Sequence, residues 1–355
     1  MSAPSSDKLL ERYSRQMLFE PIGEAGQRKL LESRVTLIGC GALGTVLANT
    51  LVRSGVGFFR IADRDFIEPN NLQRQVLFDE QDIADGLPKA EAARRKLEAV
   101  NSSVEIESHV TDVNPQNIEA LCQDAHLILD GTDNFETRFL INDVSVKHGA
   151  PWIYGACVAG EGLVMPILPR ETPCLRCIWE DAPPAGMSPT CDTVGVLSPV
   201  VNMVASFQAI HALKILTGDT DGLNRDLLTV DGWGCRVRGM NMQPAYDTGD
   251  CPCCRHDRYD FLEGKLHSQT TTLCGRDAVQ ILPSPGASQS AGETGHLERI
   301  AERLDASLEP TCNRYMLRFR VDDYEVTVFA DGRAIIKGTN DSAVARTVYS
   351  KYVGL

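Results

Sequence analysis

The sequence predicts an α/β protein with a mostly parallel sheet, followed by a small α+β domain. From Val35 to about Asp231, short apolar runs alternate with helical patterns, which is typical of βαβ units. From Tyr315 onward, two stretches alternate apolar and polar residues with a period of two around a turn, which is typical of antiparallel strands. The length of 355 residues agrees with two domains.

The apolar runs of the first domain predict its strands and helices. Each run is short and ends at glycine, aspartate or a polar turn, as buried parallel strands do. Helices are expected over residues 45–54 and 89–100, and a long apolar helix from about Ser198. The expected strands are residues 35–38, 58–62, 104–110, 127–130, 152–156 and 227–231.

Two segments rich in Pro, Gly and Ser read as loops. Residues 180–189 interrupt the α/β pattern, and residues 282–295 lie within the last part of the chain. Beyond them we expect strands over residues 315–321, 324–330 and 334–337, and a helix from about Ser342. We therefore expect one domain over residues 1–258 and an α+β extension over residues 259–355.

The composition excludes several classes of protein. Hydrophobic residues make up 43% and charged residues 23%, which is ordinary for a globular chain and excludes disorder along its whole length. Forty-eight acidic residues against 35 basic ones give a net charge of −13, and almost all of this charge lies in the first 261 residues. Because binding to phosphates needs clustered lysines and arginines, we expect no general nucleic-acid binding.

The first residues and the most apolar stretch predict a cytoplasmic protein. Residues 1–8 are polar and lack the apolar core of a signal peptide. The most apolar stretch, Val196 to Leu216, contains Gln208, His211 and Lys214, so we interpret it as a buried helix and not a membrane span. Twelve cysteines are then expected to be reduced, and they need another explanation, such as metal binding or catalysis.

A glycine-rich loop, Gly39-Cys40-Gly41-Ala42-Leu43-Gly44, follows the first predicted strand and opens a helix. Glycines let the backbone approach phosphate oxygens, and the helix N-terminus attracts negative charge, so the loop predicts a Rossmann-like nucleotide site. Asp63 ends the next strand, where it could accept hydrogen bonds from ribose hydroxyls. The loop fits NAD, FAD and ATP equally well, and a merely tight strand–helix turn is the alternative.

Three later segments carry polar residues that suit a polyphosphate. Asn70 to Gln75 is polar apart from Leu72, although an exposed loop would have the same composition. Lys89 begins a helix, where the helix dipole disfavours a cation unless it faces an anion. Asp133 follows a predicted strand, where it could bind Mg²⁺ or cap the next helix, and both interpretations stay open.

These motifs together resemble the ThiF/MoeB/HesA superfamily of adenylyltransferases, relatives of the ubiquitin-activating enzymes. The resemblance covers roughly residues 8–258 and implies that the chain binds ATP and the C-terminal Gly-Gly of a ubiquitin-fold sulfur carrier. It implies formation of a carrier acyl-adenylate with release of pyrophosphate. The motifs are Arg12-Tyr13-Ser14-Arg15-Gln16, the glycine loop, Asn71-Leu72-Gln73-Arg74-Gln75, Pro88-Lys89 and Thr132-Asp133-Asn134, in that order.

The resemblance also implies roles for individual residues. Arg74 and Lys89 would stabilise the phosphates and the developing negative charge, and Asp133 would hold Mg²⁺. Arg15 would reach into the active site of a partner subunit, which implies a homodimer. Ala42 stands where many relatives have a third glycine, a small change that should not block binding. The nucleotide is expected to contact Gly39, Gly41, Ala42, Gly44, Asp63, Asp65, Asn70, Asn71, Gln73, Arg74, Lys89, Asp133 and Asn134.

Two Cys-x-x-Cys pairs predict a structural zinc site. The pairs are Cys174–Cys177 and Cys251–Cys254, and four thiolates suit a closed tetrahedral site that joins distant segments. A redox dithiol at either pair is the weaker alternative. Spacing and resemblance favour Cys251 and Cys254 as ligands over Cys253, although the sequence leaves open whether Cys253 replaces one of them.

Cys191 ends the Pro-rich loop and is the candidate nucleophile. A reactive thiol should be accessible, which this loop position allows. In some relatives such a cysteine forms a covalent link to the carrier, and in others it is dispensable, so both outcomes stay open.

The resemblance favours the thiazole branch of thiamine synthesis, because the C-terminal segment resembles an extension on some bacterial homologues. A carrier of molybdopterin synthase, or another sulfur or tagging carrier, is the alternative with the same chemistry. An NAD(P)-dependent oxidoreductase on the same fold is the alternative of another class, and it leaves Arg74, Lys89 and the cysteine pairs unexplained. Expected partners are the carrier and a sulfurtransferase or cysteine desulfurase, with no membrane and no nucleic acid.

Overall fold

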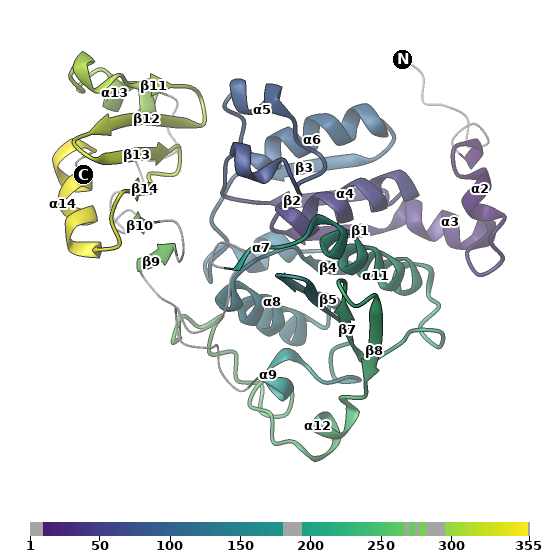
Figure 1. Cartoon of the computed structure of the whole chain (residues 1–355). Coiled ribbons are helices and arrows are strands. Elements are labelled where there is room, and N and C mark those ends of the chain that lie inside the picture. Colours follow the sequence, from purple (N-terminus) through teal and green to yellow (C-terminus); the bar gives the residue numbers. More distant parts are fainter. Residues whose placement is uncertain (1–9, 180–193, 267–269, 274–276, 282–294, 354–355) are drawn as a thin grey trace. The chain divides into compact units, whose positions relative to one another are not determined.

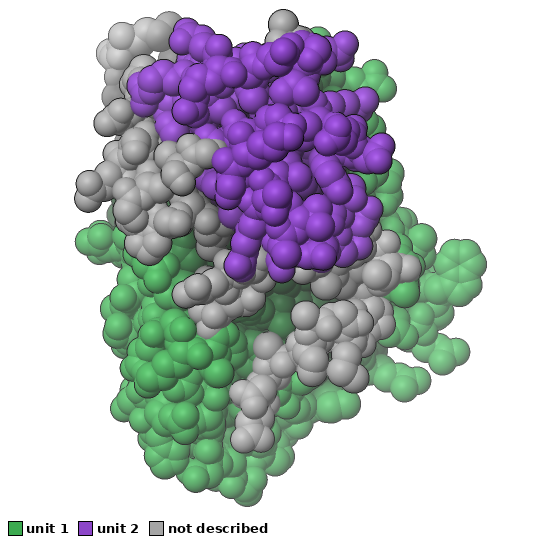
Figure 2. Space-filling view, turned by 90° about the vertical axis from the view of Figure 1, so that its left-hand side faces the viewer, with its two compact units in different colours: residues 1–183, 194–266 green, residues 184–193, 267–355 purple. Residues whose placement is uncertain are grey.

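The computed structural model describes residues 10–179, 194–266, 270–273, 277–281 and 295–353. The chain divides into two compact units, which are coloured separately in Figure 2. Unit 1 comprises residues 1–183 and 194–266, and unit 2 comprises residues 184–193 and 267–355.

Unit 1 is built around an eight-stranded sheet. The strands are β1 (Arg34–Ile38), β2 (Phe58–Ala62), β3 (Glu105–His109), β4 (Leu127–Asp130), β5 (Trp152–Val158), β6 (Glu161–Ile167), β7 (Leu227–Asp231) and β8 (Arg236–Met240). Along the sheet they follow the order β3-β2-β1-β4-β5-β6-β7-β8 (Figure 1). The first five strands in this order are parallel, and each later pair is antiparallel.

The strand order changes direction between β1 and β4. The chain builds β2 and β3 on one side of β1, and then returns to build β4 and β5 on the other. Ile38, the last residue of β1, pairs with Ala62 of β2 and with Asp130 of β4. The loops after these three strands therefore leave the sheet side by side, at the place where open α/β sheets bind ligands.

Helices cover the sheet. α4 contacts α6 and α11, and α8 contacts α7 and α9, so the helices form two packed groups. Figure 1 shows α8 on the other side of the strands from α4 and α6. The helices of unit 1 are α2 (Ser14–Met17), α3 (Gly23–Glu32), α4 (Ala42–Ser54), η1 (Pro69–Asn71), α5 (Glu80–Ala84), α6 (Lys89–Val100), α7 (Ile118–Cys122), α8 (Phe135–His148), α9 (Leu175–Ile178), α11 (Ser198–Thr217) and α12 (Gln243–Thr248).

The long apolar helix α11 belongs to the core of unit 1. By length and composition alone, it is the one helix among the described residues that could cross a membrane. It packs against α4, β5 and β6, and its side chains Gln208 and His211 are buried. The prediction that the apolar stretch forms a buried helix is therefore confirmed.

Unit 2 is an antiparallel sheet with two main helices. The strand order is β11-β12-β13-β14-β10-β9. One face of this sheet buries a separate apolar core that includes Phe319, Val326 and Tyr349. The elements are β9 (Thr270–Leu273), β10 (Ala278–Ile281), α13 (His296–Ala301), η3 (Ala306–Leu308), β11 (Thr311–Cys312), β12 (Met316–Val321), β13 (Tyr324–Phe329), β14 (Ala334–Lys337) and α14 (Ser342–Tyr352).

The predicted fold class is confirmed: a mostly parallel α/β sheet and a small α+β sheet. The expected strands and helices lie within a few residues of the observed ones. The sequence analysis did not anticipate the strands β6, β8, β9, β10 and β11, and among the described helices it anticipated α4, α6, α11 and α14 alone. The two predicted loops at residues 180–189 and 282–295 lie almost wholly outside the described residues.

Candidate functional site

The glycine loop between β1 and α4 packs tightly against the loop after β4. Gly39 has a φ of +87°, which favours glycine. A Cβ atom on Gly44 would lie 2.1 Å from the Gly39 carbonyl oxygen, and one on Gly131 would lie 2.2 Å from it. Glycine at these three positions is therefore required by backbone packing.

Gly41 differs, because its surroundings are open. A Cβ atom there would meet nothing closer than the Gln75 side-chain nitrogen, at 3.9 Å. Gly41 is also the N-cap of α4, so unpaired amide groups of the first helical turn lie beside it. Space next to a helix N-terminus suits a phosphate group, which needs close approach to the backbone.

Gln75 adds a buried polar atom next to this space. The side chain is 3% exposed, and its Oε1 atom has no hydrogen-bond partner within the parts of the chain that the structure describes. A buried amide oxygen without a partner is unfavourable, so this atom fits a bound donor or water. The open space beside Gly41 is thus the feature that suits a nucleotide phosphate, whereas Gln75 Oε1 needs a hydroxyl, an N–H group or a water as its donor. Gln75 belongs to the motif quoted from the sequence but was not among the predicted contacts.

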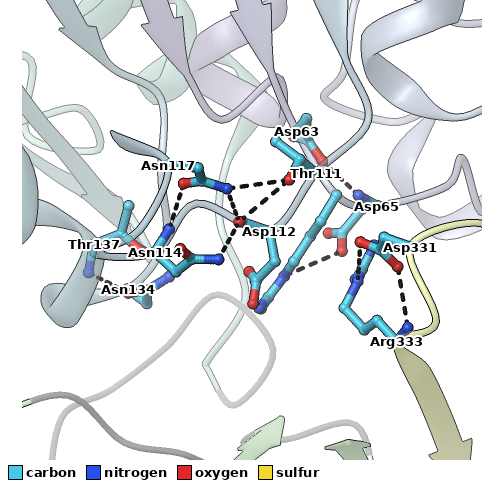
Figure 3. Close-up of polar contacts among 11 residues, drawn as sticks. Asp63, Asp65, Thr111, Asp112, Asn114, Asn117, Asn134, Thr137, Asp331 and Arg333 are labelled. Carbon is cyan, nitrogen blue, oxygen red and sulfur yellow. Dashed lines mark hydrogen bonds and ion pairs between the residues drawn. The ribbon is translucent and has the colours of Figure 1, made fainter. Parts of the chain in front are cut away.

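Asp63 is tied to the glycine loop. Its Oδ2 accepts a hydrogen bond from the Cys40 backbone N–H at 2.6 Å. Its Oδ1 accepts one from the Asp65 N–H at 2.7 Å, which Figure 3 shows. Burial raises the pKa of this carboxyl, and Lys89 opposes that rise. Asp63 therefore shapes the loop, and each oxygen keeps a lone pair for a ribose hydroxyl.

Lys89 begins α6 and is buried beside the same loop. Its Nζ lies 3.1 Å from Asp65 Oδ2, and its backbone N–H donates to the Asp65 carbonyl at 2.9 Å. Asp65 thus holds the lysine at the edge of the sheet. The Asp65 carboxylate offsets the unfavourable position of a cation at a helix N-terminus.

The segment from Asn70 to Arg74 forms a tight turn around η1. The buried Asn71 side chain accepts from the Glu68 N–H at 3.1 Å and donates to Asn70 Oδ1 at 2.7 Å. The Arg74 guanidinium donates to the Asn70 carbonyl at 2.7 Å, and Gln73 is exposed. Asn71 therefore has a local role as a cap, whereas Gln73 and Arg74 lie nearer the surface.

The loop after β4 presents Asp133 to solvent. Asp133 is exposed, and the next residue, Asn134, is the N-cap of α8: its Oδ1 accepts the Thr137 N–H at 2.8 Å (Figure 3). The interpretation of Asp133 as the helix cap is therefore wrong, because the amide of Asn134 satisfies that position. An exposed carboxylate at this edge fits Mg²⁺, which proteins hold with one or two carboxylates while phosphates and water complete the shell.

A polar cluster at the end of β3 was not anticipated. Arg64 donates to Asp112 at 2.8 Å, and the Asn114 and Asn117 side chains donate to the Asp112 carbonyl (Figure 3). The cluster fixes the loop beside Asp63 and Asp65. Asp112, Asn114 and Asn117 lie close together in the sequence, but Arg64 follows β2, so no single local motif signals the whole cluster.

Arg15 lies on α2 and is exposed. Figure 1 shows α2 and α5 on opposite sides of unit 1, and α5 begins at Glu80, a few residues after the segment of Asn70 to Arg74. Within one chain, Arg15 is therefore not brought to the other predicted residues.

The two Cys-x-x-Cys pairs form one cluster. The sulfur atoms of Cys174, Cys177, Cys251 and Cys254 all lie within 4.8 Å of one another. The Cys174–Cys251 and Cys177–Cys254 distances are 3.6 and 3.4 Å. Four sulfurs around a tetrahedral zinc at about 2.3 Å would lie about 3.8 Å apart, so the cluster fits that ion.

Cys253 lies beside Cys174 of this cluster and also contacts α8. Its Sγ lies 3.5 Å from Asp143 Oδ1 and accepts from the Asn142 amide at 3.4 Å. Asp143 also accepts the backbone N–H groups of Phe261 and Leu262, and burial raises its pKa to about 6. Cys253 therefore anchors the cysteine loop to α8. The candidate nucleophile Cys191 lies outside the described residues.

Comparison with known proteins identifies relatives of the chain. The family model described as the ThiF family matches residues 13–253. A sulfur carrier protein ThiS adenylyltransferase from Bacillus subtilis is 45% identical over 347 residues, which cover 97% of this chain and 99% of that protein. A SAMP-activating enzyme E1 from Haloferax volcanii is 35% identical over 254 residues, which cover 72% of this chain and 92% of that protein.

Solved structures share the fold. Escherichia coli MccB bound to succinimide superimposes with a TM-score of 0.60 at 24% sequence identity, covering 68% of this chain and 74% of that chain. MccB bound to an MccA derivative gives a TM-score of 0.61 at 23% identity, covering 71% of this chain and 83% of that chain. At this identity the likeness concerns the arrangement of the elements alone.

Proposed function

The chain belongs to the ThiF family, and we propose that it catalyses ATP-dependent adenylylation of the C-terminal Gly-Gly carboxylate of a ubiquitin-like sulfur carrier. The observation that carries the proposal is the 45% identity to a ThiS adenylyltransferase over nearly the whole length of both proteins. This alignment covers 97% of the chain and so includes most of unit 2, whereas the alignment to the SAMP-activating enzyme covers 72% of the chain. This supports the thiamine pathway over the molybdopterin carrier.

In the proposed reaction a carboxylate oxygen of the carrier attacks the α-phosphorus of ATP. One P–O bond forms to the carboxylate, the bond from the α-phosphorus to the bridging oxygen breaks, and pyrophosphate leaves. Two anions must meet, so positioning and neutralisation of charge dominate catalysis. Lys89, held by Asp65 at the edge of the sheet, and Arg74 would supply positive charge there.

The backbone around Gly41 would receive the phosphates, and Asp63 would accept the ribose hydroxyls. Gln75 Oε1, which has no hydrogen-bond partner among the described residues, would accept a hydrogen bond from the bound nucleotide or from a water. Asp133 would hold Mg²⁺, which when bound neutralises phosphate charge. The other predicted contacts, Gly39, Ala42, Gly44, Asn70, Asn71, Gln73 and Asn134, line or support the same three loops.

We further propose a cytoplasmic homodimer in which Arg15 completes the site of the partner. The separation of α2 from α5 within one chain supports this arrangement. Cys191 is proposed as a residue that links covalently to the carrier, and a sulfurtransferase or cysteine desulfurase would supply the sulfur.

The test is pyrophosphate exchange into ATP with purified full-length protein, Mg²⁺ and a ThiS carrier. We expect exchange with the intact carrier and none with a carrier that lacks its last two glycines. Asp133→Ala should abolish exchange, while Asp124→Ala, at an exposed turn outside the site, should not. Exchange that needs no Gly-Gly carrier would overturn the proposal, as would thermal stabilisation by NAD and not by ATP with Mg²⁺.

The cysteine cluster is proposed to hold one structural zinc ion per chain. Cys254→Ser should lower the zinc content and the thermal stability together, because a closed tetrahedral site loses a ligand. Cys253→Ser is the matched control, since its sulfur contacts Asp143 and Asn142. We expect it to keep one zinc per chain by metal analysis. Loss of zinc from Cys253→Ser and not from Cys254→Ser would reverse the assignment.

A further inference from the structure

A buried ion pair lies directly beneath the loop that carries Asp133. Asp130 ends β4 and is 0% exposed, and Arg138, in the second turn of α8, is 6% exposed. Arg138 Nε lies 3.0 Å from Asp130 Oδ2. The two residues enclose the loop from Gly131 to Asn134, which joins the strand to the helix.

Both members of the pair bind Thr132, the residue before Asp133. Asp130 Oδ1 accepts hydrogen bonds from the Thr132 backbone N–H at 2.9 Å and from its hydroxyl at 2.8 Å. Arg138 Nη2 donates to the Thr132 carbonyl at 2.8 Å. All three polar groups of Thr132 are thus bound to the pair, which fixes the peptide plane that leads into Asp133.

The pair is itself held by neighbouring elements. Arg138 Nη2 also donates to the Gly155 carbonyl at 3.1 Å, and Asp130 Oδ2 accepts the Gly155 N–H at 3.3 Å. Gln208 of α11 donates to the Asp130 carbonyl at 2.9 Å. The guanidinium lies 5.3 Å from the ring centre of Tyr154. These contacts with strand β5 and helix α11 fix the orientation of the Asp130 and Arg138 side chains.

The same loop is locked to the glycine loop on its other side. Gly131 has no room for a Cβ atom beside the Gly39 carbonyl, and its N–H donates to the Ile38 carbonyl at 2.8 Å. Movement of Thr132 would therefore change the position of Asp133 relative to the loop that receives the phosphates.

Stability alone does not explain a charged pair at this place. Burying two charges costs several kcal/mol each, and a well-packed apolar pair is often as stable. Here the hydrogen bonds of the pair converge on one residue, next to an exposed carboxylate. Burial lowers the pKa of Arg138, but the Asp130 carboxylate holds it above its usual value, and Asp133 adds a smaller attraction.

We propose that the Asp130–Arg138 pair positions Asp133 for its divalent cation by fixing Thr132. The inference rests on the proposed function. Asp130 and Arg138 act through Thr132 and so are positioning residues. Such supporting contacts typically change metal affinity about 10–100-fold when removed.

The experiment compares Arg138→Met with Arg60→Met. Arg60 is a close match, because it pairs with Glu107 at 2.7 Å and donates to the Leu121 carbonyl at 2.8 Å, and none of these partners belongs to the loop after β4. We expect Arg138→Met to raise the Mg²⁺ concentration for half-maximal exchange at least about tenfold. Arg60→Met should leave that concentration within about twofold of wild type, whatever it does to stability.

A binding readout separates positioning from a general loss of structure. In thermal shift titrations with ATP, the Mg²⁺ concentration that gives half of the maximal shift should rise for Arg138→Met by the same factor as in exchange. Thr132→Val, which keeps both buried charges and removes one hydrogen bond, should show a smaller rise, and Thr132→Ser should resemble wild type. These variants keep the test usable if Arg138→Met does not fold.

The outcomes distinguish the two proposals. No exchange by the wild-type protein with any Gly-Gly carrier would reject the proposed function. Wild-type exchange combined with an unchanged Mg²⁺ requirement in both Arg138→Met and Thr132→Val would reject the positioning role. An exchange rate that is lower by the same factor at every Mg²⁺ concentration, with an unchanged Mg²⁺ concentration for half-maximal exchange, would likewise show that the pair is only structural.

Discussion

His211 is a buried titratable residue in α11 that lies outside the proposed site. Its Nδ1 atom has no hydrogen-bond partner among the described residues. Burial lowers the pKa of His211 to about 4, with a smaller contribution from the nearby Lys214. The folded protein therefore keeps this imidazole neutral at pH values where the unfolded chain has begun to bind a proton.

The sign of the resulting pH dependence follows from the two pKa values. The unfolded value is near 6.5, so above that pH both states are neutral and full stability is present. As the pH falls towards 4, the unfolded state alone gains the proton, and stability is lost. Between pH 7.5 and 5.5 we expect a loss of roughly 1.3 kcal/mol from this residue.

His211→Leu should remove that contribution. The free energy of unfolding, measured by urea denaturation at pH 7.5 and 5.5, should fall by roughly 1.3 kcal/mol less in the variant than in wild type. Because the loss of unfolding free energy between the two pH values is compared between variant and wild type, the contributions of all other titrating groups cancel. Equal losses in the two proteins would mean that folding does not lower the pKa of His211.

At the scale of single residues, the sequence predicted where the site residues lie in the sheet better than it predicted their hydrogen-bond and ion-pair partners. Asp63, Lys89 and Asp133 follow strands or begin a helix, and the parallel pairing of β1, β2 and β4 brings those places to one edge. The sequence did not predict that Asp65 holds Lys89 or that Asn71 caps its own turn. Such contacts depend on side-chain geometry, which no spacing rule encodes.

At the scale of elements, glycines in neighbouring loops have different roles. Gly131 is enclosed by the Gly39 backbone, whereas Gly41 faces open space. We expect Gly131→Ala to cost about 3 kcal/mol of stability, because a backbone atom must move. Gly41→Ala should cost at most about 1 kcal/mol and yet weaken ATP binding about tenfold, since the methyl group would fill the space for phosphate.

Thermal denaturation with and without ATP and Mg²⁺ checks this pair of substitutions. The expected result is a lower melting temperature for Gly131→Ala and a reduced ATP-induced shift for Gly41→Ala. A normal ATP-induced shift in Gly41→Ala would mean that the nucleotide does not approach this backbone.

Helix α8 shows why some elements escaped the sequence analysis. Residues 138–146 are all buried, so the helix has no polar face and no period of 3.6 in its hydrophobicity. Its polar side chains instead serve internal contacts: Arg138 reaches the loop after β4, and Asn142 and Asp143 reach the cysteine loop. One rigid element thus supports both the candidate nucleotide site and the cysteine cluster.

At the scale of the whole molecule, the sequence predicted the class of each sheet but not its extent. β6 contains Pro166, which a strand pattern does not favour, and all five residues of β8 are exposed. β6 forms by antiparallel pairing with β5, and β8 by antiparallel pairing with β7. Neither strand carries a nucleotide motif that could have pointed to it. The boundary expected after residue 258 stays a prediction, and contact density divides the chain near residue 266.

The proposed exchange of Arg15 between subunits makes a prediction for mixtures of two inactive proteins. Arg15→Ala lacks the arginine that is donated, and Lys89→Ala lacks the lysine in the receiving site. In a mixed C2 dimer one site gains Arg15 from the Lys89→Ala chain and keeps its own Lys89, while the other site lacks both. Random reassortment of equal amounts should therefore restore about a quarter of the wild-type exchange activity. If Arg15 acts within its own chain, every site in the mixture is defective and no activity returns. Mixing each variant with itself under the same reassortment conditions is the control, and sedimentation of the mixture checks that dimers are present.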